Sequence, residues 1–350
     1  MNAPNATGSS PQYSPSLVHQ RLIEQAPLKL AFKEGTDFAF WQGEARARLQ
    51  DLIRMPANDG WDLNVRSLWK RQTELGTIEK IVFTGEPGAD IPAYWCVPEN
   101  ATPPYTTFIC LQGHSTGMHN SIAVSQEDEQ TPIEVAGDRD FGLGCMRRGV
   151  AALCIEQRCF GERAERNLDA TCQYNTCLDS AAHALMLGRT LVGERILDVD
   201  RSIDYLAGRG DVDMDRLGVM GNSGGATVAM YGAALLPRVR AVMPSCSVAT
   251  YASSLLTLYH CVDNHIPRMM EWMELADVLG IVAPKPIVIV NGEKDEIFPI
   301  DGARQTVADL RKIYRAADAE DRLEHVIGPE GHRFYADLAW PKMLSLLDRL

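Results

Sequence analysis

The stretch LGVMGNSGGATVAMY, residues 217–231, places a single serine between glycines in an otherwise apolar run. Residues 221–225 match the pattern G-x-S-x-G, in which the glycines leave room for a sharp turn between a strand and a helix. The residues before Gly221 predict a short strand, and those after Gly225 predict a helix. A serine at such a turn projects its hydroxyl above the sheet, near the positive end of the helix. We therefore predict that Ser223 is a catalytic nucleophile.

The rest of the chain alternates between strand-like and helix-like segments. An antiparallel hairpin is predicted over 78–98, where two apolar runs flank the turn-forming residues EPGAD. Further strands are predicted at 106–113, 149–157, 216–221, 238–246, 284–295 (with a polar tip) and 322–328. Helical patterns lie between several of these runs, which predicts an α/β fold with a mostly parallel sheet covered by helices on both faces. Ligands of such sheets bind at the carboxyl ends of the strands.

A serine hydroxyl needs a general base, and the base needs a partner that orients it. After a nucleophile elbow the acid is expected first and the histidine second. Asp295 follows the apolar run PIVIVNG, with Glu293 and Glu296 as alternatives for the acid. His332 lies in a glycine-bearing loop after the last predicted strand. We therefore predict the triad Ser223, Asp295 and His332.

Hydrolysis through such a triad also requires two backbone N–H groups that stabilise the oxyanion. Gly224, directly after the nucleophile, is one expected donor. The second is expected from the loop at 111–117, where the position favours His114 and then Gly113. For the side chain of His114, a substrate-facing role and a structural role both remain open. Ser245 and Cys246, after the strand at 238–244, are assigned to core packing in preference to the pocket.

The N-terminal quarter differs from the remainder of the chain. Residues 1–16 are polar and rich in Pro and Ser, which predicts a disordered arm. Residues 17–75 are predicted to form a helical extension packed on the main domain, which spans 76–350. The Met- and Tyr-rich stretch at about 247–280 fits no simple strand–helix unit and is predicted to be a small helical insertion.

Composition restricts the class of partner. The formal charge of −12, with no cluster of basic residues, argues against nucleic acid and anionic membranes as partners. No apolar run reaches the roughly 18 residues of a membrane span, and the N-terminus lacks the features of a signal peptide. The nine cysteines are an odd number, and several lie in strand-like runs, which favours buried thiols in the cytoplasm. Cys172 and Cys177 have no second pair beside them, so we expect no zinc site there.

At this point the chain resembles α/β-hydrolases, and in particular the acetyl xylan esterase and dienelactone-hydrolase-like branch. The resemblance rests on LQGHSTG (111–117), RRGVAALCIEQRCFGER (147–163), GVMGNSGGATVAMYGAAL (218–235), IVIVNGEKDEIFPIDGAR (287–304) and GPEGHRF (328–334). It implies Ser223 as nucleophile, Asp295 as acid, His332 as base, and oxyanion donors from His114 and Gly224. Two positions depart from these relatives: Cys159 stands where the sugar esterases have glycine in an Arg-Gly-Gln segment, and Ser223 replaces the cysteine nucleophile of dienelactone hydrolases.

The expected activity is hydrolysis of a small acyl ester, such as an acetyl group on a sugar, without a metal or an organic cofactor. The expected partner is a small-molecule ester, and a homo-oligomer is possible. One alternative is a peptidase or amidase that resembles the catalytic domain of prolyl oligopeptidase. The other is a catalytically silent binding protein of the same fold.

Overall fold

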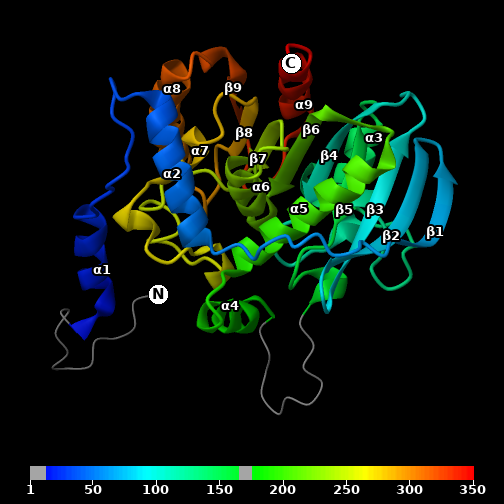
Figure 1. Ribbon diagram of the computed structural model, residues 1–350, viewed down its shortest axis with the longest axis horizontal. Coiled ribbons are helices and arrows are strands. Elements are labelled where there is room, and N and C mark those ends of the chain that lie inside the picture. Colours follow the sequence, from blue (N-terminus) through cyan, green and yellow to red (C-terminus); the bar gives the residue numbers. More distant parts are fainter. Residues whose placement is uncertain (1–12, 165–175) are drawn as a thin grey trace.

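The structure, a computed structural model, describes residues 13–164 and 176–350, and within them nine strands form one sheet (Figure 1). The order across the sheet is β1-β2-β3-β5-β4-β6-β7-β8-β9. The strands are β1 (Arg66–Thr73), β2 (Gly76–Glu86), β3 (Ala89–Pro98), β4 (Tyr105–Leu111), β5 (Ala151–Ile155), β6 (Val212–Asn222), β7 (Ala241–Ser245), β8 (Ile287–Gly292) and β9 (Leu323–Gly328). The predicted hairpin over 78–98 is confirmed as β2 and β3, and the six later strands lie within or close to their predicted ranges.

The direction of the strands divides the sheet into two parts. The first three strands are antiparallel, and β3 also pairs antiparallel with β5. From β5 to β9 every neighbouring pair is parallel. Parallel pairing brings the carboxyl ends of these strands to one edge of the sheet, and there Leu111 at the end of β4 lies opposite Gly221 of β6. The loops that follow β4, β6, β7, β8 and β9 therefore open at the same end of the molecule.

Helices cover both faces of the sheet, as predicted. They are α1 (Pro15–Glu24), α2 (Phe38–Ile53), α3 (Phe141–Met146), α4 (Thr176–Met186), α5 (Leu191–Arg209), α6 (Gly224–Leu235), α7 (Leu275–Gly280), α8 (Ile300–Ala316) and α9 (Ala336–Leu347). Short 3-10 helices are η2 (Met118–Ile122), η3 (Ala136–Asp138), η4 (Gly161–Arg163), η5 (Val262–Asn264), η6 (Met269–Glu271) and η7 (Glu320–Arg322). Helices α3 and α9 pack on one face of the sheet, and α2, α5, α6, α7 and α8 pack on the other.

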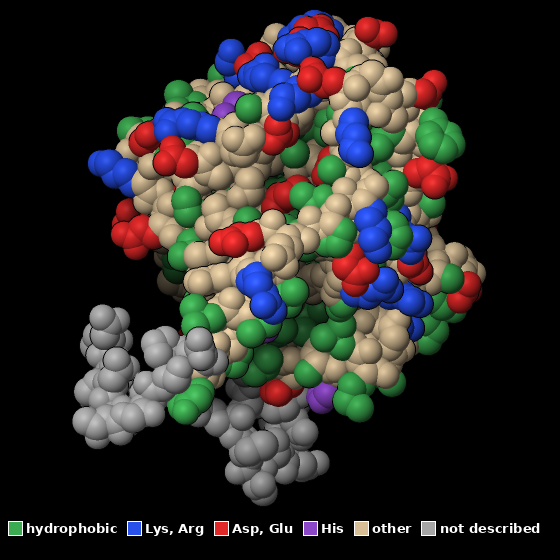
Figure 2. Space-filling model, turned by 90° about the vertical axis from the view of Figure 1, so that its left-hand side faces the viewer, with side chains coloured by type: hydrophobic (Ala, Val, Ile, Leu, Met, Phe, Trp, Pro, Cys, Tyr) green, Lys and Arg blue, Asp and Glu red, His purple; other side chains and the backbone are tan. Residues whose placement is uncertain are grey.

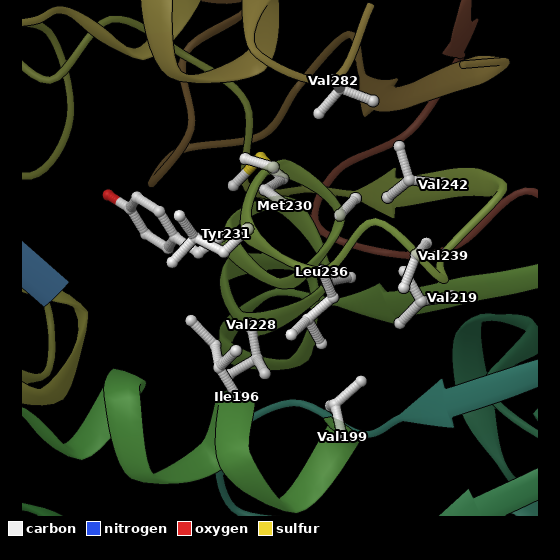
Figure 3. Packing of buried hydrophobic residues seen from close by; sticks show 14 of the residues in the cluster. Ile196, Val199, Val219, Val228, Met230, Tyr231, Leu236, Val239, Val242 and Val282 are labelled. Carbon is white, nitrogen blue, oxygen red and sulfur yellow. The ribbon is translucent and has the colours of Figure 1, made fainter. Parts of the chain in front are cut away.

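Helix α6 carries the residue after the predicted nucleophile, and it is buried along its whole length. Its Val228 and Met230 lie among Ile196 of α5, Val219 of β6 and Val242 of β7 (Figure 3). A fully buried aliphatic side chain of this kind contributes roughly 1.5–3 kcal/mol. The packing therefore fixes the N-terminal end of α6 against the strand that precedes it.

The N-terminal region departs from the expectation in two places. Residues 1–12 of the predicted disordered arm lie outside the described residues, but α1 already begins at Pro15, a residue suited to the first turn of a helix. The extension at 17–75 is not wholly helical, because Arg66–Thr73 is β1, an edge strand paired with β2. Most of its residues are exposed, so β1 lacks the apolar pattern by which a strand is usually recognised in sequence.

The stretch 247–280 contains η5, η6 and α7, joined by turns. Helix α7 begins with a capping box. The side chain of Glu274 accepts the backbone N–H of Asp277, and the side chain of Asp277 accepts the backbone N–H of Glu274. No helix within 13–164 and 176–350 is long and apolar enough to cross a membrane. Acidic and basic side chains are interspersed over the side of the molecule that lies at the left of Figure 1 (Figure 2).

Candidate active site

Ser223 lies at the sharp turn between β6 and α6, with φ 55° and ψ −124°. Positive φ is a strained conformation for a residue with a side chain, and such strain concentrates at functional sites. Two glycines make the turn possible: a Cβ atom at Gly221 would lie 2.5 Å from the carbonyl carbon of Gly225, and one at Gly225 would lie 2.2 Å from the carbonyl oxygen of Leu111. The backbone N–H of Ser223 donates to the carbonyl of Ser245 at 2.8 Å, which holds the turn against the end of β7.

Asp295 and His332 come together as a hydrogen-bonded pair at the ends of β8 and β9. The ring nitrogen Nδ1 of His332 lies 2.8 Å from Oδ2 of Asp295. The other carboxylate oxygen, Oδ1, accepts the backbone N–H groups of Ile297 and Phe298, both at 3.0 Å. Burial acts to raise the pKa of Asp295, but the contact with His332 and these two N–H bonds lower it below the ordinary value. The carboxylate thus stays ionised and orients the imidazole.

The two alternative acids do not take part in this pair. Glu293 is exposed and forms an ion pair with Arg304 at 2.8 Å. Glu296 is exposed as well. Of the three carboxylates in this loop, Asp295 alone is buried against His332.

Ser223 lines a cavity, and within the described residues its Oγ makes no hydrogen bond to His332. The end of β7 joins the turn at Ser223 to the loop that carries His332. The carbonyl of Ser245 accepts the N–H of Ser223, and the thiol of the next residue, Cys246, donates to the carbonyl of Arg333 at 3.1 Å. Burial, followed by the charge of Asp295, raises the pKa of the Cys246 thiol to about 12. Cys246 is therefore a neutral, buried thiol near Asp295, in agreement with the packing role predicted for it.

Both expected oxyanion donors carry a backbone N–H that is not used elsewhere. Gly224 is the first residue of α6, and His114 follows Gly113 in the loop after β4. Neither N–H is bonded to another group in the described parts of the chain. The two residues are also in contact, since a Cβ atom at Gly224 would lie 2.6 Å from Cε1 of the His114 ring. The imidazole thus lies directly over the start of α6.

The side chain of His114 belongs to a second cluster, which the sequence did not reveal. Its Nε2 lies 2.9 and 3.0 Å from the two oxygens of Asp263. Arg195 of α5 donates from Nη1 to Asp263 at 2.7 Å, and Arg195 and Asp263 are both fully buried. Burial acts to raise the pKa of Asp263, but these two partners hold it well below its usual range. For His114, burial lowers the pKa, yet the bond to Asp263 outweighs that effect and raises it to about 9.

A cavity of about 790 Å³ connects Ser223 with the His114 loop. Its wall is formed by the His114 loop, the segment after β5, the first turn of α4 and residues 259–264. His119 and Asn264 line this cavity, and one side-chain atom of each, Nδ1 of His119 and Oδ1 of Asn264, is buried with no hydrogen-bond partner among the described residues. Cys159, where the sugar esterases have glycine, also lies on the wall and has φ 72°, a conformation that favours glycine. The cavity wall also includes polar side chains, among them Ser115, Thr116 and Gln126.

Two groups of side chains bring together atoms of the kinds that bind metals. One is Cys246, Asp295 and His332, where the hydrogen bond between Asp295 and His332 already occupies a carboxylate oxygen and one ring nitrogen. The other consists of His114, Cys177, Cys261 and Asp263. The sequence predicts no zinc site at Cys172 and Cys177. Of these two cysteines, Cys172 lies outside the described residues. The second group has the mixed nitrogen, sulfur and oxygen donors of zinc sites.

The sequence matches the α/β-hydrolase family called the abhydrolase family over residues 12–325. The protein belongs to this family. It is 27% identical over 296 residues to the protein named "Putative hydrolase YtaP" of Bacillus subtilis (strain 168). The aligned region covers 81% of this chain and 93% of that protein.

Solved structures share the fold of this abhydrolase. One is a "putative acetyl xylan esterase" from Bacteroides fragilis NCTC 9343, with 15% identity, a TM-score of 0.74, and coverage of 93% of this chain and 84% of that chain. Another is a glucuronoyl esterase from Solibacter usitatus, with 15% identity, a TM-score of 0.61, and coverage of 92% and 96%. At these identities the likeness shows the fold alone.

Proposed function

We propose that this abhydrolase is a serine esterase that hydrolyses short-chain esters, such as acetyl esters, of a small hydroxylated alcohol. The observation that carries the proposal is the hydrogen bond between the buried carboxylate of Asp295 and the more exposed ring of His332, at the carboxyl edge of the sheet that also presents Ser223. Because Asp295 occupies Nδ1 of the ring, Nε2 is the nitrogen left to exchange a proton with the nucleophile. The solved structures of an acetyl xylan esterase and a glucuronoyl esterase support an ester of a carbohydrate-like alcohol.

The reaction follows from these roles. Ser223 Oγ attacks the ester carbonyl carbon while His332 Nε2 takes its proton, and Asp295 stabilises the resulting imidazolium. The backbone N–H groups of Gly224 and His114 donate to the oxyanion of the tetrahedral intermediate. His332 then protonates the departing alcohol, leaving an acyl-serine. Water attacks this intermediate with His332 again as base, which releases the acid and restores Ser223.

The polar wall of the cavity supports an alcohol that carries hydroxyl groups. Ser115, Thr116 and Gln126 are among the residues that line the cavity, and their side chains can exchange hydrogen bonds with hydroxyl groups. The buried thiols of the core, among them Cys96, Cys110 and Cys154, support a reducing compartment such as the cytoplasm.

The test is hydrolysis of p-nitrophenyl acetate and of acetylated sugars by the wild type and by Ser223→Ala. We expect the variant to lose on the order of 10³-fold or more in kcat, because a triad member is removed. Ser345→Ala, which truncates an exposed serine on α9, is the matched control and should keep full activity. A Ser223→Ala variant that retains the activity would refute the mechanism.

Two further measurements separate the alternatives. A fluorophosphonate probe should label Ser223 in the folded protein, and failure to label would favour a catalytically silent relative. A matched pair of ester and anilide substrates distinguishes an esterase from a peptidase. Faster cleavage of the anilide would favour the peptidase.

A further inference from the structure

Four side chains from three separate segments meet at the wall of the cavity. His114 comes from the loop after β4, Cys177 from the first turn of α4, and Cys261 and Asp263 from the segment that forms η5. One nitrogen, two sulfurs and one oxygen from these residues all lie within 4.8 Å of one another. Residues up to 149 positions apart in the chain are thus brought to one point.

This donor set is the one that Zn²⁺ prefers. Structural zinc sites hold the metal tetrahedrally with four protein ligands, usually thiolates and imidazoles and sometimes a carboxylate. With Zn–S bonds of about 2.3 Å and Zn–N and Zn–O bonds of about 2.0–2.2 Å, the ligand atoms lie roughly 3.3–3.8 Å apart. The four atoms lie within 4.8 Å of one another, and Nε2 of His114 is 2.9 Å from Oδ1 of Asp263, so metal binding requires side-chain rotations that open this contact and draw the sulfurs in.

The surroundings of the four residues also fit a metal. Ligating carboxylates are themselves held by hydrogen bonds from a second layer of residues. Arg195 supplies that bond, since its Nη1 donates to Oδ2 of Asp263, while Nε2 of His114 lies within 3.0 Å of both carboxylate oxygens. Its Nε and Nη2 donate to the carbonyl of Arg158 at 3.1 and 2.8 Å, so the guanidinium is fixed from both sides.

The charges balance as well. Two thiolates and the Asp263 carboxylate carry three negative charges, and a zinc ion with Arg195 carries three positive charges. A buried site with balanced charges avoids the large cost of an isolated ion. The buried guanidinium is therefore compatible with a metal beside it.

We propose that His114, Cys177, Cys261 and Asp263 bind a zinc ion that joins three walls of the active-site cavity. The ion has a structural role, because all four of its positions are filled by protein ligands. Binding through Nε2 leaves the Nδ1–H of His114 beside Gly224, at the oxyanion donors. The zinc ion thus positions the loop that supplies one of these donors. It is no reactant in ester hydrolysis.

The test is the metal content of untagged protein, measured by mass spectrometry after gel filtration. We expect about one zinc ion per chain in the wild type, and background levels in Cys177→Ala and Cys261→Ala. Cys145→Ala, a buried core cysteine on α3 away from the cavity, is the matched control and should keep its zinc. Removing the metal with a chelator should lower the Tm, and adding zinc should restore it.

A second measurement keeps the test independent of whether the variants fold. Cobalt(II) added to chelator-treated wild type should give the absorption of tetrahedral, thiolate-bound cobalt. Wild-type protein that contains no zinc and gives no such spectrum would overturn the proposal, and so would a folded Cys177→Ala variant with full zinc content. Labelling of Ser223 by a fluorophosphonate is read separately, so failure of the zinc site and failure of the esterase are distinguishable.

Discussion

Two histidine–aspartate pairs lie at the same end of the sheet, and they differ in which ring nitrogen is bonded. His332 meets Asp295 through Nδ1, whereas His114 meets Asp263 through Nε2. Asp295 is otherwise held by two neutral backbone N–H groups, but Asp263 faces the buried guanidinium of Arg195. The first pair leaves Nε2 of His332 unbonded, as the role proposed for it with Ser223 requires. The second is fixed by a permanent charge and two thiols, which suits a structural site.

The largest expected effect breaks the first pair. Asp295→Asn should lower kcat for p-nitrophenyl acetate by about 10⁴-fold, because the amide stabilises neither the correct tautomer nor the imidazolium. The fold should survive, since the two side chains have nearly the same shape, and thermal unfolding checks this. A variant within tenfold of the wild type would show that another residue is the acid.

The next effect tests Arg195, the buried partner of the His114–Asp263 pair. Arg195→Lys keeps the charge but loses the fork that joins Asp263 to the carbonyl of Arg158. We expect zinc affinity to fall by about 10- to 100-fold, as is typical when a second-layer partner is lost. Competition with a chromogenic chelator measures this. Arg189→Gln, which removes a partly exposed arginine paired with Glu86, is the control and should leave the affinity unchanged.

A smaller effect concerns Glu156, a buried carboxylate beside the cavity. Glu156, which follows β5, accepts the backbone N–H groups of Met118 and Glu162, each at 3.1 Å, and so braces two loops beside the cavity. Burial, with a contribution from the charge of Glu162, raises its pKa to about 7. Since the folded protein holds a proton that the unfolded chain releases near pH 4.5, this residue's contribution to stability is lost as the pH rises toward 7.

Thermal unfolding of the wild type and Glu156→Gln between pH 5 and pH 8 measures this contribution. The wild type should lose stability relative to the variant as the pH rises over this range, because glutamine does not ionise. One pKa unit corresponds to about 1.4 kcal/mol, so the difference should be readily visible. Parallel curves for the two proteins would contradict the shifted pKa.

The smallest expected effect sharpens the identity of the acid. Glu293→Gln alters an exposed carboxylate two residues from Asp295 and removes only a surface ion pair with Arg304. Such pairs contribute about 0–1 kcal/mol. The kcat of this variant should stay within about twofold of the wild type, and a large loss would assign the acid to Glu293.

The sequence was informative where local motifs carry the geometry. Gly221 and Gly225 are required by backbone contacts at the turn, so the elbow could be read from five residues. The acid and the histidine follow consecutive strands, so parallel topology alone predicts that Asp295 and His332 approach each other. The catalytic roles of Ser223, Asp295 and His332 stay predictions until the variants are measured.

Contacts between distant segments could not be predicted in this way. Asp263 lies in an irregular segment with no motif, and its partners are 68 and 149 residues away. Arg195 did give a signal, because it lies on a helix among apolar residues such as Val192 and Ile196, where a charge requires a buried partner. Asn222, which the motif left unexplained, accepts a hydrogen bond from Ser245 Oγ at 2.9 Å and so links β6 to β7.

The edge strand β1 has a consequence for how copies of this protein meet. An exposed sheet edge is a template onto which another chain can add a strand, and charged side chains discourage that addition. β1 presents Arg66, Lys70 and Arg71 along its eight residues, and its register with β2 shifts between Ser67 and Trp69. Growth of the sheet from one molecule into the next is therefore disfavoured at this end, and the long antiparallel hairpin behind β1 is shielded from aggregation.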